Sequence, residues 1–400
     1  MSNAIAVIGA MFGDEGKGLM TDFFAHTTKN SIIVRYNGGA QAAHTVDLGN
    51  GVSHVFGHIG SGSYNNAPTF LSEYFVINPR LYIKELTQFG FPVTVYVDEN
   101  CIVTTPYDVL INQTIEASRG HMKHGSCGVG FNETIVRNLS SDYKIKVKDF
   151  KDMKKVFKIL EDIRKIYVPK RLKDLGISID ISKNEFLNSS HCSTVFMDDI
   201  DEFLNHVIVS DDTVLNKFEN IIFEGAQGLL LDEEHEYFPH VTRSKTGLKN
   251  IISICEKIGV RSLFPTYVTR CYMTRHGAGP MPNEIIGRSK PYKMIEEKTN
   301  VPNRFQDHMR YGFLDLDVLS LSIKNDLDKN KSKKVSIIPA LSVTCIDQVF
   351  LEGRVKYYHH GQLHSNEVNK FLNDIFEVNK IGSGFISRGP TRKTIKRMEG

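Results

Sequence analysis

The chain has 400 residues, of which 41% are hydrophobic and 24% are charged, and its formal net charge at pH 7 is +3. This is the composition of an ordinary soluble globular protein, long enough for one large domain or for roughly two or three smaller ones. The small net charge gives no general reason to expect nucleic-acid binding, and no apolar run reaches the roughly 18 residues of a membrane span.

Short apolar runs typical of buried strands recur along the chain, and polar or glycine-containing loops follow many of them. Helical patterns lie between these runs, so the alternation predicts an α/β fold with a predominantly parallel central sheet. Without a repeat or a long linker, we expect residues 1–400 to form one domain. The predicted strands are Ala4–Ile8, Ser31–Val34, Val93–Val97, Val207–Ser210, Asn220–Phe223 and Val335–Pro339.

A glycine-rich loop, GDEGKG at residues 13–18, follows the first predicted strand. Its backbone N–H groups can bind an anion, and Lys17 adds a cation. The loop differs from the standard phosphate loop, which has a shorter spacing and places Ser or Thr after the lysine. Asp14 lies inside it, and a carboxylate beside phosphates is unfavourable unless a metal neutralises it or it performs chemistry.

A second polar loop, RYNGGAQAAHT at residues 35–45, follows the second predicted strand. Loops after neighbouring parallel strands lie close together, so Asp14 and His44 could meet at one ligand. A carboxylate base and a histidine acid suit a reaction that moves protons at neutral pH. Taken alone, His44 could equally be a structural loop histidine.

The stretch Ser141–Leu175 is rich in lysine and predicts an amphipathic helix with a solvated basic face, within a helical subregion at 141–205. A nucleic-acid patch is the weaker interpretation, because aromatic residues are few there. The apolar positions at helical spacing are Met153, Val156, Phe157, Leu160 and Ile163.

A third glycine turn, FEGAQG at residues 223–228, follows the strand Asn220–Phe223. Gln227 could hydrogen-bond the edge of a base, or the turn could merely cap a helix. The six cysteines are scattered without C-x-x-C spacing, and no secretory segment opens the chain. This favours reduced thiols and a cytoplasmic protein.

Taken together and in this order, the motifs resemble those of adenylosuccinate synthetases, the purine-biosynthesis ligases that join aspartate to inosine monophosphate (IMP) using GTP. The resemblance spans almost the entire chain. The matching segments are GDEGKG at 13–18, RYNGG at 35–39, HT at 44–45, FEGAQG at 223–228, LLD at 230–232, PHVT at 239–242, TRHGAGPMPNE at 274–284, GFLDLDVL at 312–319 and SRGPTR at 387–392.

The resemblance implies a two-step reaction. A base removes the N1 proton of the purine while the 6-oxygen attacks the γ-phosphate of GTP, and the amine of aspartate then displaces the phosphate. Asp14 would be the base and a ligand of Mg²⁺, and the carbonyl of Ala43 would be a second ligand. His44 would act on the transferring phosphoryl oxygens, and Gln227 would hold the purine.

Further residues are implied for GTP. In the segment Thr344–Asp347, the carboxylate of Asp347 would accept the N1–H and 2-amino groups of guanine, or it could be a surface turn residue. Cys345 replaces a family lysine that stacks on the base. The implied GTP-binding and phosphate-binding residues are Gly13, Glu15, Gly16, Lys17, Gly18, Thr45, Asp347, Ser387 and Gly389.

The acceptor site departs from the family pattern. Gln41 replaces an asparagine, Ser126-Cys127 replaces paired threonines, and His276 replaces a small apolar residue. Arg137 would reach the nucleotide phosphate of a partner subunit, which implies a homodimer, or it could be a surface arginine. The implied acceptor residues are Gln41, Ser126, Cys127, Arg137, Leu231, Thr242 and His276.

The loop that closes over aspartate departs further, because its paired threonines and regular arginines are absent. Asn303, Arg304 and Arg310 remain as candidates, and two cations would suffice for a dicarboxylate. Either arginine could instead lie on the surface. IMP, GTP and L-aspartate are therefore the expected substrates. The alternatives are (d)GMP as acceptor, as in viral relatives, another amine, or a nucleotide-binding regulator without catalysis. No nucleic-acid or membrane partner is expected.

Overall fold

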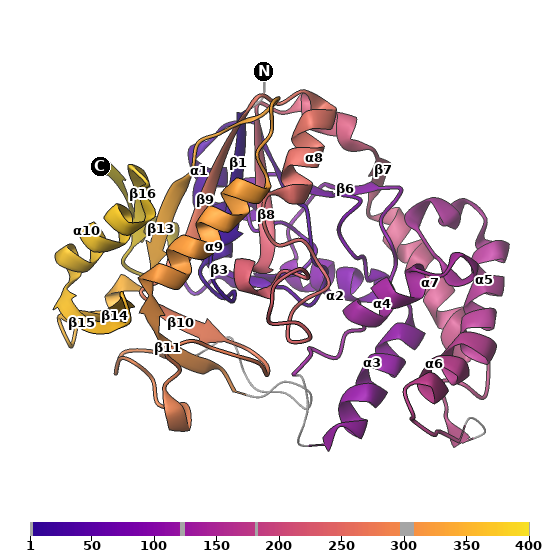
Figure 1. Cartoon of the computed structure of the whole chain (residues 1–400). Helices are drawn as coiled ribbons and strands as arrows, with labels where there is room; N and C mark the ends of the chain where they lie inside the picture. The colour runs from indigo at the N-terminus through magenta and orange to yellow at the C-terminus, as the bar shows by residue number, and fades with distance from the viewer. Residues whose placement is uncertain (1–2, 121–124, 181–182, 297–307, 400) are drawn as a thin grey trace.

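A large twisted sheet runs through the centre of the computed structural model, which describes residues 3–120, 125–180, 183–296 and 308–399 (Figure 1). All neighbouring strands pair in parallel except the edge strand β17. Eleven strands make up this sheet. In sheet order they are β17 (Ile395–Glu399), β16 (Ser383–Ser387), β13 (Ala340–Thr344), β9 (Ser262–Arg270), β1 (Asn3–Gly9), β8 (Asn220–Gly228), β2 (Ser31–Arg35), β5 (Thr69–Leu71), β6 (Val95–Asp98) and β7 (Ile208–Ser210), with β12 (Ser336–Ile337) beside β9.

The predicted α/β fold with a mostly parallel sheet is confirmed, and the chain forms a single α/β domain. Each predicted strand matches an observed one to within a few residues, although Val335–Pro339 shortens to the two residues of β12. The central strand β9 has no counterpart among the predictions. Its interior proline, Pro265, pairs with Ala6 of β1 and is a residue that normally argues against a central strand.

Helices cover both faces of the sheet because the side chains of a strand alternate between its faces. Ala6 and Ile8 of β1 pack in the same cluster as α8 and α9, whereas Val7 packs with α1. The helices are α1 (Lys17–Thr27), α2 (Pro79–Phe89), α3 (Pro106–Ser118), α4 (Phe131–Asn138), α5 (Met153–Asp162), α6 (Val168–Asp174), α7 (His191–Asn205), α8 (Lys249–Ile258), α9 (Leu316–Lys329) and α10 (Val368–Asn379).

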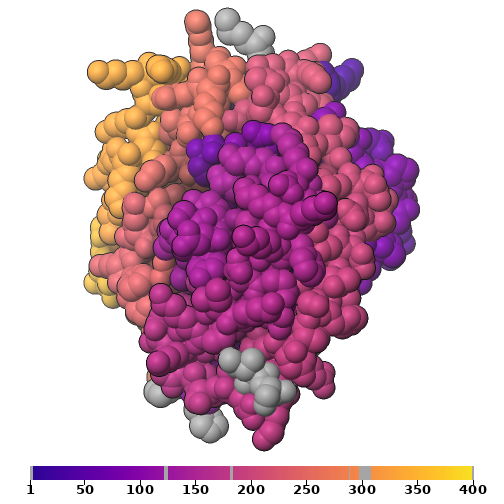
Figure 2. Space-filling view, turned by 90° about the vertical axis from the view of Figure 1, so that its right-hand side faces the viewer, coloured from indigo at the N-terminus to yellow at the C-terminus, as the bar shows by residue number. Residues whose placement is uncertain are grey.

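Helices α3 to α7 form a separate group at one side of the sheet (Figure 1), and Figure 2 shows them covering that face of the molecule. Val156, Leu160 and Ile163 are fully buried in its core, while Lys154 and Lys155 are exposed. An amphipathic helix therefore occupies this part of the lysine-rich stretch. Within the described chain, no helix combines the length and apolar character needed to cross a membrane.

Two smaller sheets complete the fold. One contains β10 (Tyr272–Arg275), β11 (Arg310–Asp315), β14 (Arg354–His359) and β15 (Gln362–Glu367). The other is the ribbon of β3 (His44–Asp47) and β4 (Ser53–Phe56). This ribbon carries His44 toward the start of α1, where the two elements are in contact.

Candidate active site

A cavity of about 720 Å³ lies at the carboxyl ends of β1, β2, β8 and β9. The loops after these strands line one side, and residues of α3 and α4 line the other. Parallel α/β sheets bind ligands at this edge. The cavity therefore brings together the three glycine-containing loops at 13–18, 35–45 and 223–228, which the sequence singles out.

The loop at 13–18 ends in helix α1, whose first residues Lys17 and Gly18 line the cavity. The N–H groups of the first turn of a helix have no partner within the helix and can bind an anion. Gly16 takes the N-cap position with φ of 93°, a conformation that favours glycine. Gly18 is needed for a different reason, because a Cβ at this position would lie 2.7 Å from Cβ of His44. The loop is tied to β13 by a hydrogen bond of 2.9 Å from Thr344 Oγ1 to the carbonyl of Glu15.

Two buried charges accompany this loop. Burial raises the pKa of Glu15 to about 7, although Lys17 opposes the shift. Burial likewise lowers the pKa of Lys17, and Glu15 and Asp14 oppose that shift. No hydrogen bond engages Lys17 Nζ among the described residues. A buried ammonium with no hydrogen-bond partner is suited to an incoming phosphate.

Asp14 is held with its carboxylate at the cavity. Its backbone has φ of 55°, an uncommon value for a residue other than glycine. The side chain of Arg270 donates to its carbonyl oxygen. The carboxylate is 31% exposed, and Oδ2 lies 3.3 Å from Nε2 of His276. Asp14 therefore has a direct partner in the acceptor region, a contact that the sequence did not predict.

His44 stands in front of a buried carboxylate. Its Nδ1 lies 2.6 Å from Oε1 of Glu224. The hydroxyl of Ser61 also donates to Oε1, and the backbone N–H of Ser61 donates to Oε2. Burial lowers the pKa of His44 to about 4. Burial would raise the pKa of Glu224, but Arg35 and His44 outweigh it and bring this pKa to about 2. Without ligands, His44 is thus a neutral imidazole that donates through Nδ1 to Glu224.

Several polar side-chain atoms at the cavity are buried and have no hydrogen-bond partner among the described residues. They include both amide atoms of Gln41, Oε1 of Gln227 and Nδ1 of His276. Buried polar groups in native proteins are nearly always hydrogen-bonded. Unsatisfied groups gathered at one cavity therefore indicate a polar ligand. Gln227 also has φ of 57°, outside the range of a β-strand. Its side chain therefore does not follow the alternation between the two faces of the sheet that the rest of β8 shows.

The acceptor candidates other than Arg137 line this same cavity. The hydroxyl of Ser126 accepts a 3.0 Å hydrogen bond from Asn112 of α3, and burial raises the pKa of the Cys127 thiol to about 11. Thr242 is joined to Leu231 through a backbone hydrogen bond of 2.9 Å. The remaining lining candidates are Gln41 and His276, together with Gly13, Glu15, Gly16, Gly18, Ala43 and Thr45 of the phosphate side.

The sequence reasoning missed two residues of the site, of which the first lines the cavity and the second lies buried behind it. Arg243 is exposed at the cavity, and no hydrogen bond or ion pair joins its guanidinium to another described residue. Its signal in the sequence was a cation directly after Thr242 of the PHVT segment. Glu224, which supports His44, is the second. Its signal was a lone carboxylate inside an apolar strand.

The candidates for guanine binding lie beside the phosphate loop rather than in the cavity wall. Asp347 follows β13, and Ser387 ends the neighbouring strand β16. Asp347 is half-buried, and burial raises its pKa. The hydroxyl of Ser387 donates a 2.7 Å hydrogen bond to the carbonyl of Gly389. The structure thus gathers these three residues at the ends of two paired strands.

Arg137 does not lie where the sequence suggested, either as a surface arginine or as a ligand of a partner's nucleotide. It is fully buried. Its Nε and Nη2 each donate to Asp108 at 2.8 Å, and Nη2 also donates to the carbonyl of Val103. The physical reason is that Asp108 and Arg137 face each other between α3 and α4. Arg137 is a structural ion-pair residue here.

None of the three candidates for aspartate binding is found in the described wall of the cavity. Arg310 is engaged inside the chain, with Nε and Nη2 donating to Glu284 and Nη1 donating to the carbonyls of Gly277 and Gly279. It is not part of the cavity wall. Asn303 and Arg304 lie outside the described residues.

Comparison with known proteins identifies the family. The sequence pattern of the adenylosuccinate synthetase family matches residues 6–348. The chain belongs to this family. An adenylosuccinate synthetase of Mesoplasma florum is 29% identical over 332 residues, which cover 80% of this chain and 74% of that protein. A member of the adenylosuccinate synthetase family is a carbon–nitrogen ligase, so the predicted enzyme class is confirmed.

Two solved structures share the fold. One is a fully ligated adenylosuccinate synthetase from Plasmodium falciparum, with a TM-score of 0.74, 18% identity and coverage of 98% of this chain and 99% of that chain. The other is the cyanophage S-2L succinoaminodeoxyadenylate synthetase PurZ, bound to dGMP and to dATP as an energy donor. It has a TM-score of 0.62, 14% identity and coverage of 99% and 95%.

Proposed function

We propose that this adenylosuccinate synthetase family member joins L-aspartate to IMP with GTP as phosphoryl donor. The observation that carries the proposal is that Asp14, Lys17, His44 and Gln227 line one cavity. A base, a phosphate-binding cation, an imidazole and a purine-binding amide are the groups that the two-step reaction needs.

Asp14 is the proposed base. Its carboxylate takes the proton from N1 of the purine, so that negative charge develops on the 6-oxygen. That oxygen attacks the γ-phosphorus of GTP, and GDP leaves. The amine of aspartate then attacks C6, and phosphate leaves with the oxygen. Gln227, whose Oε1 has no hydrogen-bond partner within the described part of the chain, fixes the edge of the purine during both steps.

His44 and Lys17 stabilise the phosphoryl group that moves. Nδ1 of His44 is held by Glu224, so the ring keeps one orientation and presents its other nitrogen for a phosphoryl oxygen. The negative charge of bound phosphates favours a proton on this ring, and the buried carboxylate of Glu224 can balance it. Lys17 neutralises charge on the donor phosphates.

Mg²⁺ fits the proposed donor set. The carboxylate of Asp14 and the backbone carbonyl of Ala43 are hard oxygen ligands at the same cavity, as Mg²⁺ prefers. When bound, the ion would neutralise charge on the phosphoryl oxygens. Nε2 of His276 lies beside Oδ2 of Asp14. When the substrates are bound, the ring of His276 would either keep this contact while Mg²⁺ binds the same carboxylate or rotate away from it.

We assign the acceptor phosphate to residues of this chain at the cavity wall. Thr242 and Arg243 follow one another along the cavity wall, and the unsatisfied amide of Gln41 lies at the same cavity. Arg243 supplies the cation that the buried Arg137 cannot supply. An arginine can hold a phosphate through two parallel hydrogen bonds.

His276 is the reason to propose (d)GMP as an alternative acceptor nucleotide. The 2-amino group of guanine needs a hydrogen-bond acceptor that hypoxanthine does not need, and Nδ1 of His276 has no hydrogen-bond partner among the residues that the structure describes. PurZ, which shares the fold, was solved with dGMP. Aspartate remains the proposed amine on the strength of the family, because Arg310 is engaged with Glu284.

The deciding experiment is a substrate matrix with the purified chain and Mg²⁺. IMP, dIMP, GMP and dGMP are each supplied with GTP or ATP and with aspartate or other amines, and mass spectrometry identifies the product. Adenylosuccinate from IMP, GTP and aspartate is the expected result. Product only with dGMP would overturn the inosinate assignment. Absence of product and of nucleotide turnover in every combination would favour a regulator.

Cellular setting and assembly follow the same proposal. All six cysteines are free thiols, which suits the cytoplasm. A homodimer is proposed from the family alone, because the buried position of Arg137 removes the reason for a residue acting across subunits. Light scattering coupled to size exclusion measures this directly.

A further inference from the structure

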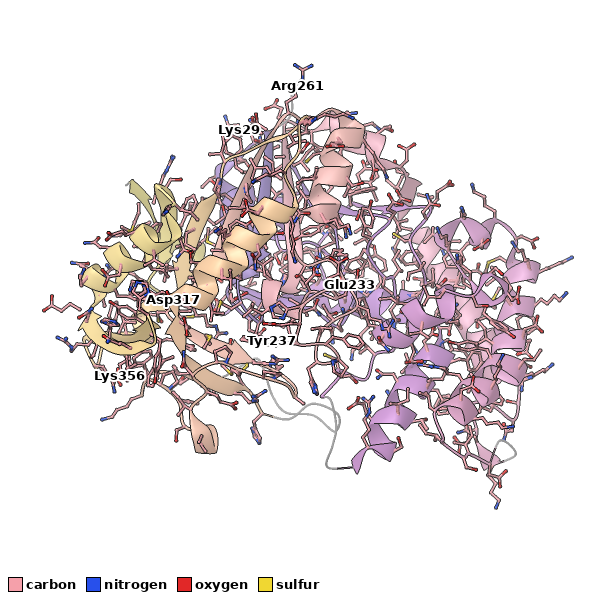
Figure 3. The ribbon with its side chains drawn as sticks, viewed as in Figure 1. Lys29, Glu233, Tyr237, Arg261, Asp317 and Lys356 are labelled. Atoms are coloured by element: carbon pink, nitrogen blue, oxygen red, sulfur yellow. The ribbon has the colours of Figure 1, made fainter. Side chains whose placement is uncertain are left out.

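A cluster of imidazoles and a carboxylate lies outside the active site. Asp317 is in the first turn of α9, His359 ends β14, and His360 opens the turn to β15. Asp317 Oδ1 is 3.8 Å from Nε2 of His359 and 3.5 Å from Nδ1 of His360. The three donor atoms lie within 4.8 Å of one another. Figure 3 labels Asp317 at the β14–β15 side of the molecule, apart from Tyr237, which stacks on Phe12 of the cavity wall.

The backbone fixes these three residues relative to one another. Strands β11 and β14 pair in parallel immediately before them, with Asp315 opposite Tyr358. Asp315 also caps α9 by accepting a hydrogen bond from the N–H of Asp317. His360 has φ of 50° and precedes Gly361 at 70°, so the tight turn folds its ring back toward the helix.

The carboxylate of Asp317 is oriented for a ligand. Its Oδ2 accepts a hydrogen bond of 2.5 Å from the backbone N–H of His360. The other oxygen, Oδ1, faces both imidazoles. In metal sites of proteins, a ligating carboxylate commonly accepts a hydrogen bond through its other oxygen, because this bond orients the ligating oxygen toward the metal.

The separations match a small cation. Ligands about 2.0 Å from a tetrahedral Zn²⁺ lie about 3.3 Å apart, a little closer than the two separations here. Two imidazoles with one carboxylate suit Zn²⁺, Ni²⁺ or Cu²⁺ rather than Mg²⁺, which prefers oxygen donors. We propose that Asp317, His359 and His360 form a binding site for a divalent transition metal, with Zn²⁺ as the probe, separate from the Mg²⁺ of the reaction.

The bound metal would join the β14–β15 hairpin to the N-terminus of α9. His364 lies on the same face of the hairpin, with its ring centroid 6.2 Å from that of His359. Its ring stacks on Tyr357. The open fourth position is therefore assigned to water, and His364 serves as a neighbouring imidazole that the proposed site does not need.

The test is calorimetric titration of the EDTA-treated and dialysed full chain with ZnCl₂. We expect a site of micromolar affinity that His359→Ala and His360→Ala each weaken at least about tenfold. His206→Ala is the matched control, because His206 is an exposed histidine paired only with Glu202 among the described residues. That variant and His364→Ala should bind Zn²⁺ as the unaltered chain does.

A second readout is the melting temperature. Zn²⁺ should raise it in the unaltered chain and in His206→Ala but not in the His359→Ala/His360→Ala double variant, since a ligand that binds only the folded state stabilises it. Ligase activity with Mg²⁺ should be equal in all variants. Zinc binding that is unchanged in the double variant, or no binding in the unaltered chain, would overturn the proposal whatever the substrate matrix shows.

Discussion

Asp14 is the residue on which the proposed chemistry depends. Its left-handed backbone and its contact with Arg270 hold the carboxylate at the cavity. Asp14→Asn keeps the shape but cannot accept a proton. We expect kcat to fall roughly 10²–10⁴-fold, the usual contribution of a general base, while GTP still binds. GDP release measures the rate and calorimetry measures GTP binding. An active Asp14→Asn enzyme would refute the role of base.

Arg243 lines the cavity, and we propose that it belongs to the acceptor site. Because a hydrogen bond to a charged group contributes roughly 1.5–3 kcal/mol, Arg243→Ala should raise KM for the acceptor nucleotide about 10- to 100-fold. KM for GTP should not change. Initial rates at varied IMP and GTP give both constants.

The control for Arg243 is Arg261→Ala. Arg261 is an exposed arginine at the top of the molecule, well apart from Tyr237 (Figure 3). This change should leave both constants unaltered. Equal KM values for IMP in the Arg243→Ala and unaltered enzymes would remove Arg243 from the phosphate site without touching the assignment of the reaction.

At the scale of elements, the pair of Asp108 and Arg137 holds α3 against α4. Arg137→Ala leaves a buried carboxylate unpaired, which typically costs about 3–5 kcal/mol of unfolding free energy. We expect a large drop in stability in urea unfolding. KM for IMP in the folded enzyme should stay the same, because Arg137 does not line the cavity.

Arg80→Ala is the matched control for this prediction. Arg80 is 70% exposed and lies 3.9 Å from Asp199, and such surface pairs contribute at most about 1 kcal/mol. Its removal should therefore scarcely change unfolding. If Arg137→Ala were as stable as Arg80→Ala, the ion pair would not be what joins α3 to α4.

At the scale of the whole molecule, Asp326 connects three elements in the core. Its carboxylate accepts hydrogen bonds from the N–H of Leu248 before α8 and from the hydroxyl of Tyr267 on β9, while Asp326 itself belongs to α9. Burial raises its pKa from 3.8 to about 6. The folded state therefore keeps this proton to a higher pH than the unfolded state.

The sign of the pH dependence follows from this pKa. Between about pH 4 and pH 6 the folded state binds more protons, so the contribution of Asp326 to stability is greatest at low pH and decreases as the pH rises. A shift of about two units corresponds to roughly 3 kcal/mol. Urea unfolding across this range should show a smaller decrease with pH for Asp326→Asn than for the unaltered chain. Parallel curves would contradict the raised pKa.

The sequence by itself determined the reaction class and the central strands that carry it. The runs in β1, β2 and β8 are short, apolar and followed by glycine loops, and such signals are local in the chain. Asp14, Lys17 and His44 stand in motifs whose order along the chain matches one family. The strand β9 was not predicted because Pro265 lies inside it, and proline normally argues against a central strand. Its central place in the sheet depends on pairing with strands that are far away in sequence.

Only the tertiary structure decided which side chains pair. Glu224 supports His44 across 180 residues, and Arg137 pairs with Asp108 across 29. These contacts depend on how helices and strands pack, which no local pattern encodes. The same packing engaged Arg310 with Glu284 and left Arg243 open to the cavity. Local loops therefore carry the motifs of the reaction, whereas the assembled fold positions the cations that we propose as substrate ligands.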